Sequence, residues 1–69
     1  MKKVKPDTAR KGEYIESFEV YDTPERHIRE TCASMESLLK ARKKKGEIVY
    51  TLIGEGKPGA TWQIYWLRG

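Results

Sequence analysis

The 69-residue chain has little of what small proteins commonly use to reinforce a thin core, since it contains one cysteine, Cys32, and one histidine, His27. A lone cysteine cannot close a disulfide within the chain, and neither residue has a companion of its own kind with which to build a zinc site. A chain of this length buries about 60% of the surface that its unfolded form exposes, which leaves room for one domain. We therefore expect either a well-packed minimal core or a homodimer, with no cofactor.

The sequence also lacks a long apolar segment. No run of about 18 apolar residues is present, so a transmembrane helix is not expected. The basic N-terminal residues are not followed by the apolar stretch of a secretory signal peptide. A single unpaired cysteine is consistent with a reducing compartment. Together these absences predict a cytoplasmic protein.

The pattern of apolar residues predicts one α+β domain over residues 13–69, preceded by a flexible basic N-terminal arm over 1–12 that has no apolar periodicity. Residues 13–21 are dense in β-branched and aromatic residues, which favours a strand, although Tyr14, Phe18 and Tyr21 also have helical spacing. Residues 47–53 and 61–67 alternate as two further strands, with apolar residues on both faces.

A helix is expected to begin at Thr23, Pro24 and Glu25, because these residues supply an N-cap hydroxyl, a proline at the first helical position and an acid at the positive end of the helix dipole. It is expected to end at Gly46, as a left-handed C-cap. The weak helical patch at residues 31–34 does not interrupt the phase of the apolar positions, which are Ile28, Cys32, Met35 and Leu39. The unbroken phase favours one helix of about six turns over two helices.

The predicted fold is β-α-β-β, with a three-stranded, mainly antiparallel sheet packed on this one long helix. The helix covers one apolar sheet face, and the second face needs another layer or a second subunit, which is the reason for expecting a homodimer. The alternative is a compact winged helix, which the chain resembles over residues 24–67 at most. In that alternative residues 13–21 are helical, residues 31–34 form the turn and residues 47–67 form the wing.

The segment from Gly54 to Gly59 matches the pattern G-x-G-x-x-G. Such glycines bind a dinucleotide when they open a helix inside a βαβ unit, whereas a strand is expected to follow here. Lys57 is followed by Pro58, which excludes a Walker A loop. The resemblance to a protein-kinase glycine loop covers ten residues, and the chain has no room for the two lobes of a kinase. We interpret the segment as a hairpin loop.

Side chains suited to catalysis are scarce. His27 lies between Arg26 and Arg29, and the carboxylates do not cluster at the spacing of metal ligands. Cys32 falls on the apolar stripe of the helix, where a cysteine is usually a buried hydrophobe with a raised pKa. Trp62 and Trp66 could stack on single-stranded bases, but we expect them to belong to the core. The prediction is a protein without enzymatic activity, catalytic residues or metal ligands.

The net charge of +4 is divided into blocks along the sequence. Residues 1–11 and 26–46 hold the excess of lysine and arginine, whereas residues 12–25 contain five acids and no base. A basic helix face with small residues in its middle would allow close approach to a phosphate backbone. The residues expected to contact nucleic acid are Arg26, Arg29, Lys40, Lys43, Lys44, Lys45 and Lys57.

These observations lead to two hypotheses of function. The first is a small, non-catalytic and regulatory nucleic-acid-binding protein, with DNA favoured over RNA, that contacts phosphates through the helix face and a wing-like hairpin tip. The alternative is a protein-interaction module, such as a small adaptor or inhibitor encoded by a phage or another mobile genetic element. That module would use the second apolar sheet face and the acidic strand, and the protein partner expected for the chain is acidic.

Overall fold

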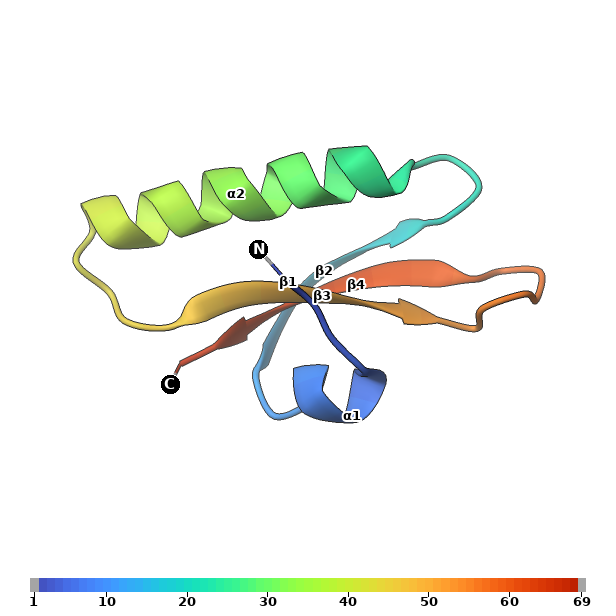
Figure 1. Ribbon diagram of the computed structural model, residues 1–69, viewed down its shortest axis with the longest axis horizontal. Coiled ribbons are helices and arrows are strands. Elements are labelled where there is room, and N and C mark those ends of the chain that lie inside the picture. The colour runs from blue at the N-terminus through green and yellow to red at the C-terminus, as the bar shows by residue number, and fades with distance from the viewer. Residues whose placement is uncertain (1, 69) are drawn as a thin grey trace.

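The computed structural model describes residues 2–68 and confirms the α+β class, with one long helix packed on a sheet (Figure 1). In chain order the elements are β1 (Lys2–Lys3), α1 (Pro6–Ala9), β2 (Glu13–Glu19), α2 (Glu25–Ala41), β3 (Glu47–Ile53) and β4 (Thr61–Leu67). Within residues 2–68, no helix is both long and apolar enough to cross a membrane.

The sheet is mixed and has four strands in the order β1-β3-β4-β2. Strands β3 and β4 form an antiparallel hairpin, β2 pairs antiparallel with the other side of β4, and β1 pairs parallel with β3. The predicted three-stranded sheet was therefore wrong by one strand. The added strand, Lys2–Lys3, pairs through its backbone, and it has no alternation of apolar residues from which a strand could be predicted.

The winged-helix alternative was also wrong. Residues 13–19 form a strand rather than a helix, and α2 continues without a turn through residues 31–34. The hairpin interpretation of the glycine-rich segment is confirmed, because residues 54–60 join β3 to β4 and no helix follows them. The N–H of Lys57 donates to the carbonyl of Gly54 (3.0 Å) and closes a turn within this loop.

The main core lies between α2 and the sheet. Ile28 and Cys32 of α2 are fully buried, as the unbroken helical phase predicted. Facing them, the pleat of β3 and β4 directs alternate side chains toward the helix: Ile48, Tyr50, Trp62 and Ile64. Met35 and Leu39 pack against the same cluster at its margin. The apolar stripe of the sequence is thus the stripe that α2 buries.

The opposite face of the sheet is covered by the N-terminal residues of the chain itself. Figure 1 shows three layers, with α2 on one side of the sheet and the short α1 on the other. Ala9 of α1 is fully buried against Val49 and Tyr65, and Val4 packs on the same cluster. Within the segment 1–12, expected to be a flexible arm, Val4 and α1 therefore lie against the face that suggested a homodimer, and β1 joins the edge of the sheet. The homodimer itself stays a prediction.

The start of α2 is held by the sheet rather than by a cap. Thr23 was expected to cap the helix through its side chain, but Pro24 occupies the N-cap position and no side-chain cap is formed. The Thr23 carbonyl accepts a hydrogen bond from the indole N–H of Trp62 (2.9 Å). The Tyr50 hydroxyl donates to Glu25 in the first turn (2.6 Å). Two side chains of the sheet therefore position the first turn of α2.

Gly46 is the position in the α2–β3 connection where a side chain is least tolerable. Its φ is +115°, and an added Cβ would lie 2.4 Å from both the Leu67 carbonyl oxygen and the Trp66 indole nitrogen. We expect Gly46→Ala to lower the free energy of unfolding by about 2–5 kcal/mol, from left-handed strain plus overpacking. Gly56→Ala is the control, because Gly56 also has positive φ (+77°) but no atom lies within 4 Å of its added Cβ. Equal losses for the two variants in urea denaturation would contradict the packing argument.

The contact between Tyr50 and Glu25 predicts a pH-dependent contribution to stability. The Tyr50 hydroxyl, helped by the charges of Lys3 and Arg29, holds the pKa of Glu25 below its ordinary value of 4.5. A lowered carboxyl pKa contributes stability that is present above 4.5 and is lost as the pH falls through the folded-state value. We expect Tyr50→Phe to lower the free energy of unfolding at neutral pH and to do so by less in acid. A difference between the two proteins that stays constant with pH would rule out this coupling.

The same contact acts in alkali with the opposite sign. Burial, together with the hydrogen bond to Glu25, raises the pKa of Tyr50 from 10.0 to about 12. A raised tyrosine pKa contributes stability that is complete below pH 10 and is lost as the pH rises toward 12. Unfolding curves of the Tyr50→Phe variant should therefore lack this alkaline loss.

Candidate nucleic-acid interface

The bases expected to bind nucleic acid do not form one continuous face. Arg26 and Arg29 lie in the first turns of α2, and Lys57 lies in the β3–β4 loop at the same end of the molecule (Figure 1). Lys40 and the lysines of residues 43–45 lie at the opposite end, where α2 stops and β3 begins. The molecule is 39 Å long, and α2 alone spans about 25 Å at 1.5 Å per residue. The structure therefore separates the seven residues into two groups.

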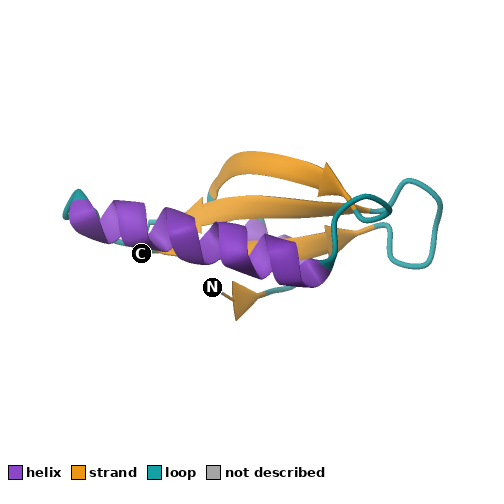
Figure 2. Cartoon of the chain, turned by 90° about the horizontal axis from the view of Figure 1, so that it is seen from above, coloured by secondary structure: helices purple, strands orange, loops and turns teal. Residues whose placement is uncertain are grey.

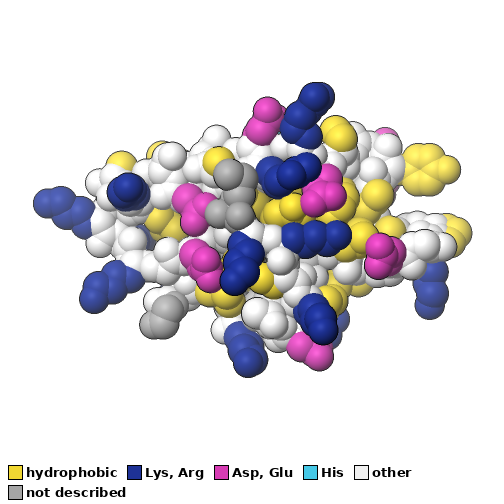
Figure 3. Space-filling view, in the orientation of Figure 1, with side chains coloured by type: hydrophobic (Ala, Val, Ile, Leu, Met, Phe, Trp, Pro, Cys, Tyr) yellow, Lys and Arg dark blue, Asp and Glu magenta, His cyan; other side chains and the backbone are white. Residues whose placement is uncertain are grey.

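The denser group forms what we call the basic end, made of Lys40, Arg42, Lys43, Lys44, Lys45 and Arg68. All six are exposed, and within residues 2–68 the five bases of 40–45 make no ion pair. Two acids flank these five bases in the sequence, Glu36 one turn earlier on α2 and Glu47 at the start of β3. In Figure 3 the outermost side chains at the end of the molecule where α2 stops are lysine or arginine. Elsewhere on that face acids and bases alternate.

The chain leaves α2 through a Schellman motif that directs these lysines. Lys43 has a left-handed conformation, with φ of 56°. Its N–H donates to the Lys40 carbonyl (3.0 Å), and the N–H of Lys44 donates to the Leu39 carbonyl (2.9 Å). Glycine is the usual residue at this left-handed position. The expected C-cap at Gly46 was thus misplaced, because the helix ends at Ala41 and Lys43 makes the reversal.

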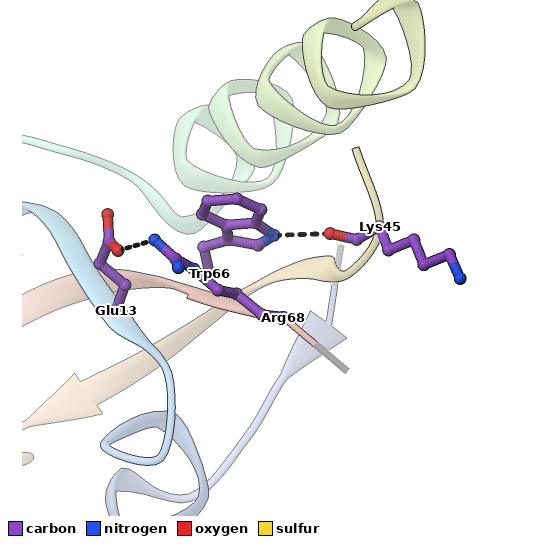
Figure 4. Close-up of polar contacts among 4 residues, drawn as sticks. All are labelled: Glu13, Lys45, Trp66 and Arg68. Atoms are coloured by element: carbon purple, nitrogen blue, oxygen red, sulfur yellow. Dashed lines mark hydrogen bonds and ion pairs between the residues drawn. The ribbon is translucent and has the colours of Figure 1, made fainter. Parts of the chain in front are cut away.

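The indole of Trp66 holds the loop of the basic end in place (Figure 4). Its N–H donates to the carbonyl of Lys45 (3.1 Å), and the Arg68 guanidinium lies 4.5 Å from the ring centroid. The ammonium of Lys44 lies 5.7 Å from the same centroid. Arg68 is itself held by an ion pair with the carboxylate of Glu13. One aromatic ring therefore gathers two cations and a loop carbonyl beside the end of the sheet.

A shallow hollow of about 400 Å³ opens next to this ring, between the end of α2 and the start of β3. It is lined by two lysines, one acid and three uncharged residues: Lys40, Lys44, Glu36, Ser37, Leu39 and Gly46. An anionic group that enters the hollow would meet two cations and one acid. The hollow thus adds shape to the basic end, and its charge remains mixed.

The residues considered for catalysis, metal binding or base stacking make contacts within the fold. Cys32 is fully buried, and burial raises the pKa of its thiol to about 11, as its place on the apolar stripe predicted. The His27 ring meets the Phe18 ring edge to face, with centroids 6.4 Å apart. Trp62 is buried and packs on Tyr50. The described residues contain no group of three or more His, Cys, Asp or Glu side chains placed to share a metal ion.

Sequence reasoning missed three members of this arrangement: Arg42, Arg68 and Trp66. Arg42 lies exposed at the C-cap of α2. Arg68 lies beside the loop because the hairpin register pairs Glu47 with Leu67. A hairpin centred near Lys57 has that register, so the two strand lengths in the sequence contain the signal that could have found Arg68.

Comparison of the chain with protein-family models, with curated proteins and with solved structures finds no match.

Substitution of Lys43 tests whether a lysine at this left-handed position lowers the free energy of unfolding. A residue other than glycine in the left-handed conformation lowers the stability of the fold by about 1–2 kcal/mol. Replacement by glycine removes this strain but adds the larger conformational entropy that glycine loses on folding, so the net gain in stability is the difference between the two. We expect Lys43→Gly to raise the free energy of unfolding by about 0.5–1 kcal/mol. The control is Lys45→Gly, because Lys45 does not have positive φ and should gain nothing. A loss of stability in Lys43→Gly, measured by thermal unfolding, would contradict the strain argument.

Proposed function

We propose that this protein is a non-catalytic nucleic-acid-binding protein that holds the phosphate backbone of duplex DNA with its basic end. The observation that carries the proposal is the run of five exposed bases over residues 40–45, none of which is ion-paired with a described residue. Lysine and arginine that neutralise phosphates release condensed counterions, and this release supplies most of the sequence-independent affinity for DNA. We propose a regulatory role for this binding.

The backbone geometry of the basic end supports the proposal. A flexible lysine run loses entropy when it binds, whereas this loop is already ordered by the Schellman motif and by the indole of Trp66. Lysine at Lys43 occupies a position where glycine would be easier, and strained residues of this kind cluster at functional sites. The positive charge is thus kept at some cost in stability.

The dimensions of the molecule favour backbone contact over the reading of bases. Across its long axis the molecule measures 22 × 15 Å, wider than the major groove of B-DNA at about 12 Å. Such an end would rest on the phosphates that border the groove rather than enter it. The proposal therefore includes no sequence-specific contact, and phosphate contacts position a protein without specifying sequence.

The test is a titration of labelled duplex DNA with the protein at two salt concentrations. If about four phosphates are neutralised, affinity should fall by about 100-fold between about 50 and about 200 mM salt. The triple variant Lys40→Gln, Lys43→Gln, Lys45→Gln should reduce the slope of log affinity against log salt by about 3 and weaken binding at low salt by at least about 10-fold.

The control variant removes the same charge from exposed lysines elsewhere: Lys2→Gln, Lys5→Gln, Lys11→Gln. Both triple variants carry a formal net charge of 4 − 3 = +1, so a difference between them reports position rather than total charge. Binding that is absent at low salt, or that both variants weaken equally, would overturn the proposal. Tighter binding of duplex RNA or single-stranded DNA in parallel titrations would overturn the choice of duplex DNA.

A further inference from the structure

Strand β2 is an open edge of the sheet. It is the last strand in the order β1-β3-β4-β2, and every one of its residues is exposed except Phe18, which is half-buried. Figure 2 shows α2 lying over the β3 side of the sheet, with β2 left uncovered at the far edge. Backbone N–H and C=O groups on the outer side of an edge strand have no partner strand and can pair with another chain. The fold therefore presents seven residues of extended backbone that could accept a further strand.

An apolar groove runs between this edge strand and α2. It has a volume of about 200 Å³, and it is lined by Ile15 of β2, by Met35, Leu38 and Leu39 of α2, and by Ile48 and Trp66 on its floor. Leu38 is 56% exposed and Ile15 is 36% exposed, which makes them two of the four large hydrophobic side chains that the surface leaves open. A groove of this size accepts one or two side chains, and a docked helix would need a longer surface. It suits a side chain projecting from an extended segment beside β2.

The charge beside the groove selects the chemistry of that segment. Residues 12–25 contain five acids and no base. Glu13 is paired with Arg68 and Glu25 accepts a hydrogen bond from Tyr50, whereas the carboxylates of Glu16 and Glu19 make no hydrogen bond or ion pair with a described residue. Arg42 also lines the groove. The strand register places Glu16 on the helix-facing side, beside the groove, and Glu19 on the other side, so one carboxylate is available on each face of the open edge.

We infer that β2 is a docking edge for an extended basic segment of a partner protein that carries lysine or arginine on both of its faces. The segment adds as a fifth strand beside β2. One apolar side chain of the segment enters the groove over Ile15 and Leu38, and two of its bases lie opposite Glu16 and Glu19, one on each face of the sheet. In strand addition of this kind the backbone hydrogen bonds supply affinity and alternate side chains supply specificity.

The same charges disfavour a second copy of this chain as the occupant. Pairing two β2 strands would bring Glu16 and Glu19 of one copy against acids of the other, and like charges on facing strands are destabilising. Acidic side chains on an edge strand are also a device that keeps it from pairing with its own copies. An edge that repels its own copies remains open to a basic strand. Arg42 of the basic end also lines this groove, whereas the lysines of residues 40–45 do not.

The probe is a blocked peptide of about eight residues, a typical strand length, in which lysine and valine follow the repeating order Lys-Val-Val, so that successive lysines fall on opposite faces of the added strand. It is added to the isotopically labelled protein, and amide chemical shifts are followed by NMR. We expect saturable shifts at residues 13–19 and at Leu38, together with slower hydrogen exchange in β2. A peptide of the same sequence with alternate backbone nitrogens methylated is the control for non-specific charge attraction, because it keeps the charges and cannot complete the ladder.

Two variants test the two parts of the inference. The double variant Glu16→Lys, Glu19→Lys should weaken binding of the peptide by at least about 10-fold. Each charge pair across strands contributes up to about 1 kcal/mol, and the charge reversal adds repulsion. Glu30→Lys, Glu55→Lys is the matched control, with the same charge change at exposed positions away from β2. Leu38→Gln changes an exposed groove residue, so the fold should survive while peptide binding weakens.

Several outcomes would overturn the inference: no shifts in β2, equal binding of the methylated peptide, or equal weakening by the two charge variants. Concentration-dependent shifts in β2 without peptide would make a second copy the occupant and would also reject it. The Lys40→Gln, Lys43→Gln, Lys45→Gln variant should bind the peptide as well as the unaltered protein does. Failure of DNA binding and failure of peptide binding can therefore be told apart.

Discussion

Two indole N–H groups on one face of β4 hold both ends of α2, and the rest of the structure depends on this constraint. Trp62 donates to the carbonyl of Thr23 before the helix, and Trp66 donates to the carbonyl of Lys45 after it. Both carbonyls belong to segments that no helical hydrogen bond satisfies, and an unpaired carbonyl in the partly buried surroundings of Thr23 would be costly. The helix is thereby aligned with the hairpin, and its apolar stripe meets the helix-facing side of the sheet.

This alignment also produces the two surfaces on which the functional arguments depend. Because Trp66 holds Lys45, the lysine run after α2 is an ordered end of the molecule rather than a loose tail. Because α2 lies over β3, the far strand β2 keeps an open edge and an apolar groove, whose floor includes Trp66 again. The basic end and the edge strand β2 are thus neighbours that share the ring of Trp66, although they carry opposite charge.

Much of the fold could be predicted from the sequence because its main signals are local. The phase of Ile28 and Cys32 identified the buried stripe of α2, and alternation in residues 47–53 and 61–67 identified the hairpin strands. The errors arose where tertiary contacts replaced local rules. Thr23 has a side chain suited to an N-cap, but it is its carbonyl that is used, as the acceptor of a hydrogen bond from Trp62. Gly46 is a residue type typical of a C-cap, but hydrogen bonds to the carbonyls of Leu39 and Lys40 end the helix earlier.

By itself the sequence determined the α+β class, the one long helix, the buried cysteine and the division of charge into blocks, because periodicity and composition are properties of neighbouring residues. The tertiary structure alone decided which bases lie together, that Val4 and α1 cover the second sheet face, and that β2 is the exposed edge. These features depend on strand order and register. They follow from backbone pairing between distant segments, such as Lys2 with Val49, and no local pattern of side chains encodes that pairing.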